Sequence, residues 1–256
     1  MNLLPLQKGI LYGPINSRRL GKSLGINLMP RKYKLCSFNC VYCHYGWTRV
    51  HTIDVNPYVD DLPKFDDVME AIQSALISKL QFDYITFSGN GEPTLHPQFA
   101  ILAAEIARLR DKHRPEVKIA LLSNSSELNA AVKESIVHID LPVFKLDAGT
   151  SQTFSAINRP ARGVDMARIT EHLQSLDGIY IQTVLIHGSP CNTTGEELHA
   201  YYQRLKIIHP RKVHIYSIDR PVPNAKIERV LPDELEKIAI SGTETTGVEV
   251  QAFYLR

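Results

Sequence analysis

Three cysteines stand close together near residue 40 of this 256-residue chain. Cys36, Cys40 and Cys43 form the pattern C-x3-C-x2-C, and the fourth cysteine, Cys191, lies far downstream. Three clustered thiols and one distant thiol do not make a regular disulfide framework, whereas thiolates in a reducing compartment are good metal ligands. Three thiolates can hold three irons of a 4Fe–4S cluster and leave the fourth iron open to an outside ligand. The spacing therefore predicts a cluster-binding loop over residues 36–43.

Zinc is the alternative metal for these thiols, with His44 or Cys191 as the fourth ligand. His44 follows Cys43 directly, and two adjacent side chains are poorly placed to reach the same tetrahedral ion. An iron–sulfur cluster is therefore favoured over zinc.

The elements that position these thiols are indicated by the hydrophobic periods of the chain. Helical spacing of apolar residues predicts helices over residues 65–80, 97–113, 127–137, 150–157, 164–176, 193–208 and 232–240. Short apolar runs between them predict strands over residues 23–28, 82–89, 117–125, 141–149, 179–188 and 213–219. Because each parallel crossover needs a connection of helix length, this alternation predicts a mainly parallel α/β sheet.

About six strand–helix units are fewer than the eight of a closed barrel. We therefore expect a partial (β/α)6 TIM-like barrel in a single domain over residues 1–256, with an open doubly wound sheet as the alternative. Residues 1–35 form its basic N-terminal segment, which includes the first strand. In such folds the reactive groups lie at the carboxyl ends of the strands. The candidate site residues at those ends are Asn90, Gly91, Glu92, Ser123, Asn124, Lys145 and Asp147.

The charge of the chain is uneven along its length. Residues 1–53 carry eight Lys or Arg side chains and no Asp or Glu, although the net charge of the whole chain is only +2. A solvated basic face and a contact surface for a nucleic acid both explain this excess. Hydrophobic residues at 44% and charged residues at 22% are typical of a globular protein. No apolar run approaches the length of a membrane span and no signal peptide is evident, so we expect a cytoplasmic protein without a membrane partner.

The motif CSFNCVYC at residues 36–43, with an aromatic residue before its last cysteine, resembles the signature of the radical S-adenosylmethionine (SAM) superfamily. The segment GNGEP at residues 89–93 resembles the GGE-like element of that family, with Asn90 in place of the first glycine. The resemblance implies that Cys36, Cys40 and Cys43 hold a 4Fe–4S cluster. It also implies that the amino and carboxylate groups of SAM chelate the open iron, in a partial (β/α)6 barrel. A flavodoxin- or ferredoxin-like electron donor is the implied partner.

The same resemblance suggests roles for the strand-end residues, and each role has a structural alternative. Gly91 and Glu92, with Asn90, are expected to meet the SAM amino group, or else to form only a turn. Ser123 and Asn124 are expected at the SAM carboxylate or ribose, or as a helix cap. Lys145 and Asp147 share one strand face and are expected to bind SAM, or else to pair with each other. Arg159 is a further candidate for the pocket of Lys145 and Asp147. By the same resemblance His187 and Tyr216 are candidates for the adenine pocket, or else are only packed at their strand ends.

Residues 11–165 more specifically resemble the Fe–S oxidoreductase group related to wybutosine biosynthesis enzymes, which modify a guanosine in transfer RNA. Those enzymes bind a second cluster through additional cysteines, and here only Cys191 is spare. The implied function is reductive cleavage of SAM to a 5′-deoxyadenosyl radical that abstracts hydrogen from a tRNA or a small-molecule substrate. Two alternatives are an activating enzyme that generates a radical on a partner protein, and a non-catalytic metal- or RNA-binding protein.

Overall fold

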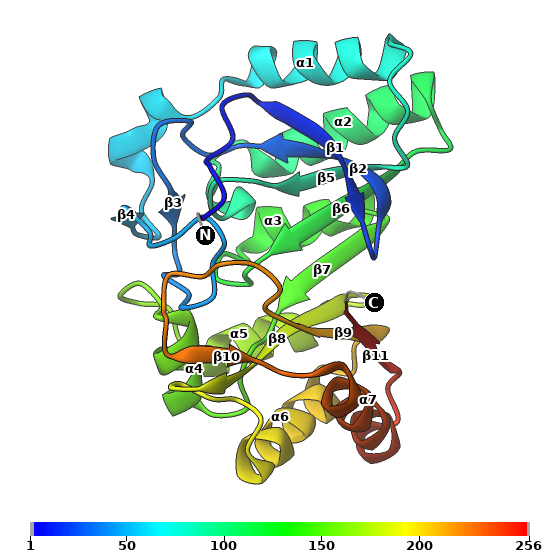
Figure 1. The fold of residues 1–256 in the computed structure, drawn as a ribbon. Helices are drawn as coiled ribbons and strands as arrows, with labels where there is room; N and C mark the ends of the chain where they lie inside the picture. Colours follow the sequence, from blue (N-terminus) through cyan, green and yellow to red (C-terminus); the bar gives the residue numbers. More distant parts are fainter. Residues whose placement is uncertain (1–2, 255–256) are drawn as a thin grey trace. The chain divides into compact units, whose positions relative to one another are not determined.

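The computed structural model describes residues 3–254, which form two compact units (Figure 1). The N-terminal unit holds residues 6–37 and 49–142, and the C-terminal unit holds residues 38–48, those from 143 onward and the first few of the chain. Residues 1–2 and 255–256, which fall within the predicted domain, lie outside the described residues. The single domain expected over residues 1–256 stays a prediction.

The N-terminal unit is built on a four-strand portion of sheet in the order β1-β2-β5-β6. Strands β2 (Gly21–Asn27), β5 (Tyr84–Ser88) and β6 (Lys118–Ser123) are parallel, as the alternation predicts. Between them run α1 (Phe65–Ile77) and α2 (Phe99–His113), which lie side by side along this sheet (Figure 1). The apolar face of α1, including Val68 and Ile72, is completely buried. The short elements are η1 (Asn56–Asp61), η2 (Pro93–Leu95), α3 (Ala130–Ser135) and η3 (Ile136–His138).

The first cysteine of the motif lies on a short strand that pairs with another short strand. Strand β3 (Leu35–Cys36) pairs in parallel with β4 (Val50–His51), and the Thr52 amide extends the pairing by donating to the Cys36 carbonyl at 3.2 Å. Leu35 also forms a parallel bridge with Gly91. The first cysteine is therefore fixed by backbone pairing on two sides.

The C-terminal unit repeats the strand–helix alternation. Strands β7 (Leu141–Lys145), β8 (Tyr180–Gly188), β9 (Lys212–Ser217) and β11 (Val250–Phe253) pair in parallel in that order, with β7 starting just before the unit does. Strand β10 (Ile227–Arg229) adds to β8 in the antiparallel direction. The helices are α4 (Ser151–Asn158), α5 (Met166–Gln174), α6 (Gly195–Ile208) and α7 (Pro232–Thr246).

Several boundaries differ from the sequence-based expectation. Strand β1 (Leu11–Ser17) was not anticipated because Pro14 interrupts its pattern, and its antiparallel pairing with β2 shifts register between Tyr12 and Ile15. A proline has no N–H to donate, so it is tolerated at an edge strand or a bulge. The strand expected over residues 141–149 ends at Lys145, and the residues after it form a loop. None of the helices formed by residues 3–254 has the length and hydropathy that a bilayer crossing requires.

Candidate cofactor site

The thiol of Cys36 lies beside an amide donor from the end of β6. Asn124 points its side-chain nitrogen at two acceptors, Cys36 Sγ at 3.5 Å and Ser37 Oγ at 2.9 Å. Asn124 is 8% exposed, so water competes little for these hydrogen bonds. Hydrogen bonds to cysteine sulfur stabilise the negative charge that a metal-bound thiolate carries. Asn124, one of the predicted residues, thus lies against the first predicted ligand.

Glu92 belongs to the same network and is only 1% exposed. Its Oε2 accepts from the Asn124 backbone N–H at 2.6 Å, and its Oε1 accepts from the Thr94 N–H at 3.1 Å and the Thr94 hydroxyl at 2.7 Å. Burial raises the pKa of Glu92, and these hydrogen bonds, together with one from Ser123, offset only part of that rise. A buried carboxylate of this kind is a good partner for a cation, because a positive charge would remove the cost of its burial.

The two residues before Glu92 hold backbone segments together. Asn90 is fully buried, and its side chain donates to the Gln7 and Pro30 carbonyls at 2.9 Å and 3.0 Å while accepting from the Gln7 N–H at 2.7 Å. A Cβ on Gly91 would lie 1.6 Å from the Leu35 carbonyl oxygen, so only glycine fits there. In this structure the close approach at Gly91 is made by the β3 backbone.

The second cysteine, in the C-terminal unit, has a matching amide neighbour. Asn158, the last residue of α4, has its side-chain nitrogen 3.5 Å from Cys40 Sγ. The backbone around Cys40 is pinned to the same helix end, because the Val41 N–H donates to the Ile157 carbonyl at 2.9 Å. Cys43 follows in a tight turn in which its N–H donates to the Cys40 carbonyl at 3.2 Å. Asn158 was not among the predicted site residues, although its neighbour Arg159 was a candidate.

Asp147 is the centre of the polar network in this unit, and its side chain is completely buried. Its Oδ2 accepts from the Tyr42 hydroxyl and from Asn158 Nδ2, the latter at 2.7 Å. Its Oδ1 accepts from the Val184 N–H at 2.8 Å and lies 3.6 Å from Lys145 Nζ. Burial, followed by the Asp147 charge, raises the pKa of Tyr42 well above its ordinary value, so the phenol stays a neutral donor.

Lys145 has two aromatic neighbours in addition to Asp147. Its Nζ lies 5.1 Å from the ring centre of Tyr42 and 5.8 Å from that of Tyr216, within the range of cation–π attraction. Lys145 and Asp147 therefore lie together, although β7 ends at Lys145 and Asp147 belongs to the loop that follows. Tyr216, also a candidate from the sequence, is thus one of the two aromatic residues beside Lys145.

The residues present fit an iron–sulfur cluster in their chemistry. None of the four cysteines, all within the described range, forms a disulfide, and two of the three motif thiols have buried amide donors. Asn158 Oδ1 is buried without a hydrogen-bond partner, which leaves an unused acceptor beside Cys40. Across residues 3–254 no three His, Cys, Asp or Glu side chains are gathered as a ready-made metal site. Cys36 and Cys40 belong to different units, and each thiol has its amide donor within its own unit.

Two other sequence candidates lie outside these networks. Arg159 is exposed, and its guanidinium stacks over Trp47 at 4.8 Å instead of reaching the buried carboxylate. His187 bonds to Glu234 at 2.8 Å.

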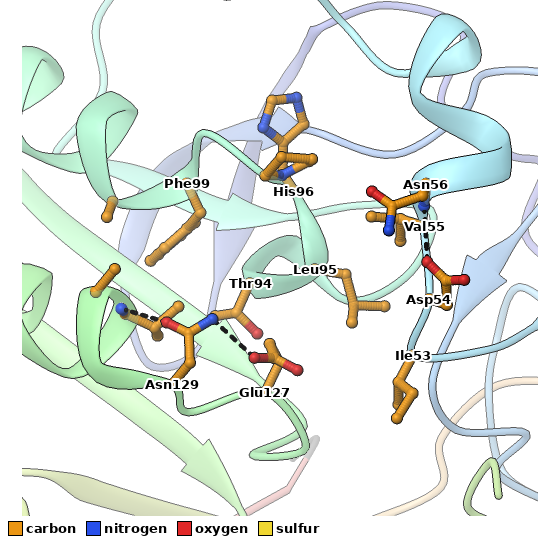
Figure 2. Close-up of a pocket in the computed structure, with 14 residues that line it drawn as sticks. Ile53, Asp54, Val55, Asn56, Thr94, Leu95, His96, Phe99, Glu127 and Asn129 are labelled. Atoms are coloured by element: carbon orange, nitrogen blue, oxygen red, sulfur yellow. Dashed lines mark hydrogen bonds between the residues drawn. The ribbon is translucent and has the colours of Figure 1, made fainter. Parts of the chain in front are cut away.

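A pocket of about 250 Å³ lies elsewhere in the N-terminal unit, bordered by η2 and the start of α3 (Figure 2). Its rim carries the carboxylates of Asp54 and Glu127, the latter accepting from Asn129 Nδ2 at 2.8 Å. None of the predicted cofactor residues lines it. The pocket touches the network only through Thr94, so we assign it no part in cofactor binding.

Comparison with known proteins finds a matching family, curated relatives and similar solved structures. The sequence profile of the Radical SAM superfamily matches residues 32–205. A UPF0026 protein of Methanocaldococcus jannaschii is 34% identical over 234 residues, which are 90% of this chain and 68% of that protein. A protein named GTPase Obg from Brachyspira hyodysenteriae is 29% identical over 89% of this chain, but the chain spans only 32% of its length. A solved structure of TYW1 with a lysine-pyruvate adduct bound has a TM-score of 0.59 at 15% identity, covering 88% of this chain and 74% of that one.

The likeness to TYW1 confirms the predicted α/β fold of the radical SAM type, and the profile match confirms the predicted superfamily. The predicted cofactors, a 4Fe–4S cluster and SAM, are those of the matched family. With a profile match over more than half of its length, this chain belongs to the radical SAM superfamily and is a radical SAM enzyme.

Proposed function

We propose that Cys36, Cys40 and Cys43 hold the 4Fe–4S cluster and that the enzyme cleaves SAM reductively to start a hydrogen abstraction. When bound, the cluster supplies one electron to the sulfonium of SAM, which yields methionine and a 5′-deoxyadenosyl radical that takes hydrogen from the substrate. The observation that carries this proposal is the pair of buried amides, Asn124 and Asn158, beside Cys36 and Cys40. Such donors suit thiolates that are charged in the working protein.

The remaining residues of the two networks bind and orient SAM in this proposal. Glu92 accepts from the SAM ammonium, because it is a buried carboxylate whose hydrogen bonds come only from neutral donors. Lys145 offers a cation to the SAM carboxylate, and Asp147 accepts from its ribose hydroxyls. Ser123 supports Glu92, and the backbone beside Gly91 and Asn90 shapes the loop.

Cluster ligation is tested by metal analysis after anaerobic reconstitution. We expect about four irons and four sulfides per chain, the content of one 4Fe–4S cluster. Changing any one of Cys36, Cys40 or Cys43 to Ala should remove most of the iron, because metal affinity depends on every thiolate ligand. Cys191→Ala is the matched control and should keep the parent's iron content. Stoichiometric zinc without iron, or full iron in the three variants, would contradict the proposed ligand set.

For the substrate, we propose a tRNA, on the resemblance to the wybutosine group and on the basic N-terminal segment. In the structure Arg18, Lys22, Arg31 and Lys32 are exposed, as a phosphate contact requires. Lys34 belongs to the same basic segment but is only 5% exposed, so it is not part of the proposed contact. The favoured contact is therefore the pair Arg31 and Lys32.

The RNA proposal is tested by tRNA binding at a series of salt concentrations. Changing Arg31 and Lys32 together to Gln should reduce the log–log salt slope by about 1.5, because each phosphate contact contributes about 0.7–0.9. The control pair Lys79→Gln and Lys112→Gln, which is also exposed, should leave the slope unchanged. If tRNA does not bind at low salt, the substrate is instead a small molecule or a partner protein.

A further inference from the structure

A second group of reactive side chains lies outside the cofactor networks, at the end of β8, in the loop that follows it and on α7. Cys191 Sγ lies 3.2 Å from Thr193 Oγ1, and Thr193 Oγ1 lies 2.8 Å from His187 Nδ1. On its other side, His187 Nε2 lies 2.8 Å from Glu234 Oε2. A thiol, a hydroxyl, an imidazole and a carboxylate therefore form one continuous hydrogen-bonded relay.

The direction of this relay follows from the acceptor at its end. Glu234 can only accept, so His187 Nε2 carries a proton and donates it to the carboxylate. His187 Nδ1 is then the acceptor for the Thr193 hydroxyl, which in turn accepts from the Cys191 thiol. Moving one proton from Cys191 through Thr193 to His187 gives a thiolate and an imidazolium. The Glu234 carboxylate stabilises the imidazolium, which is the usual way in which a nucleophile is activated by an oriented base.

The loop that carries Cys191 is anchored on both sides of the thiol. The Asn192 side chain is 2% exposed, donates to the Val184 carbonyl at 2.8 Å and the Asp147 carbonyl at 2.7 Å, and accepts from the Ile186 N–H at 2.8 Å. On the other side, the Ser189 N–H donates to the Lys226 carbonyl at 2.9 Å. The thiol is thus held in place relative to its base.

The relay is also open to reagents. The side chains of His187 and Glu234 are 34% and 39% exposed, and Cys191 is half-buried. Partial burial raises the pKa of the Cys191 thiol, but Thr193 and His187 stabilise its thiolate form and outweigh burial, so the net pKa lies below its ordinary value. The hydrogen bond to Glu234 raises the pKa of His187.

Four further charged groups on β10, just before it and on α7 are exposed. Glu228 on β10 pairs across the strands with His187, Arg229 pairs with Ile186, Lys226 lies just before β10, and Asp233 stands beside Glu234 on α7. Of these, Glu228 lies directly opposite His187, and its carboxylate favours the protonated imidazole as Glu234 does. The ion pair of thiolate and imidazolium is therefore supported by its surroundings.

We propose that Cys191 is a nucleophilic thiol that reacts with a low-molecular-weight disulfide by thiol–disulfide exchange. The Cys191 thiolate attacks one sulfur of the disulfide, a new S–S bond forms, and the original S–S bond breaks. The released thiolate takes the proton from the His187 imidazolium. Cys191 and one half of the reagent end as a mixed disulfide, so the thiol is oxidised and the other half of the reagent is reduced to a thiol. This site stands apart from the proposed cleavage of SAM, and its test does not depend on that reaction.

The test uses the anaerobically reconstituted holoprotein, in which the motif cysteines are occupied by the cluster. Its alkylation by iodoacetamide is followed by mass spectrometry at Cys191 between pH 5 and pH 10. We expect the rate to rise with a midpoint below about 8.5, the value of an ordinary thiol. Incubation with glutathione disulfide should then give one glutathione adduct at Cys191, which dithiothreitol removes.

Two variants separate the relay from simple exposure. His187→Gln and Thr193→Val should each lower the alkylation rate at pH 7 at least threefold and move the midpoint upward. His199→Gln, an exposed histidine on α6, is the matched control and should behave as the parent. A parent midpoint at or above 8.5, an unchanged rate in both variants, or no glutathione adduct would each overturn the proposal.

Discussion

The hydrogen bond from Asn124 to Cys36 should set part of the reduction potential of the cluster. Asn124→Ala removes the N–H at 3.5 Å from Cys36 Sγ and keeps the backbone N–H that serves Glu92. Reduction adds negative charge to the cluster and its sulfurs, so a donor at sulfur stabilises the reduced form more than the oxidised form. The variant should therefore have a more negative potential than the parent.

The size of this shift follows from the strength of one hydrogen bond. A net contribution of about 0.5–1.5 kcal/mol corresponds to about 20–65 mV for a one-electron couple. The lower part of this range applies, because sulfur is a weak acceptor and the 3.5 Å separation is long. We expect a shift of about −20 to −40 mV.

An anaerobic redox titration followed by electron paramagnetic resonance measures this potential directly. Asn129→Ala is the matched control, because Asn129 caps α3 through the Val132 N–H at 3.0 Å and has no contact with a cysteine. That change should lower stability by about 1 kcal/mol and leave the potential unchanged. A potential in Asn124→Ala equal to that of the parent, or more positive, would refute the reasoning.

Two further changes test neighbouring parts of the N-terminal unit. Glu92→Gln should weaken SAM binding about ten- to a hundredfold at unchanged iron content, because a charge-assisted hydrogen bond is worth about 1.5–3 kcal/mol. Calorimetric titration against the control Glu127→Gln measures this, and parental affinity would exclude the ammonium contact. Gly91→Ala should cost about 2 kcal/mol or more in urea unfolding, since its Cβ would lie 1.6 Å from the Leu35 oxygen. Gly195→Ala, with open space around its Cβ position, should not destabilise, and equal losses in both would contradict the packing argument.

The fold class and the cysteine loop could be predicted because both are local properties of the sequence. Strand–helix alternation is visible in windows of about ten residues, and the motif spans only residues 36–43. Lys145 does approach Asp147, at 3.6 Å, but β7 ends at Lys145, so the loop after the strand, and not the alternation of side chains along it, brings Asp147 there.

The partners of the site residues could not be predicted in this way. Asn158 reaches Cys40 across 118 positions, and nothing in the helix that ends there distinguishes this asparagine from a cap. Arg159 was the sequence candidate at this helix end, but the preceding Asn158 side chain points inward and Arg159 is exposed. The relay at Cys191 depends on Glu234, which is 47 positions from His187 and reaches it only through the packing of α7. Such contacts are set by tertiary structure, which a single sequence does not display.

Trp47, on which Arg159 stacks, has a practical consequence for spectroscopic measurements on this enzyme. Trp47 is the only tryptophan of the chain, is 43% exposed, and follows Cys43 by four positions in the same unit. All indole fluorescence therefore originates from one ring next to the cysteine motif. Iron–sulfur chromophores absorb broadly in the near ultraviolet and visible, so an emitter this close loses its excitation by energy transfer when the motif is loaded. Quenching of the intrinsic tryptophan fluorescence should therefore report whether the cysteine motif holds its cluster, with no signal from any other tryptophan.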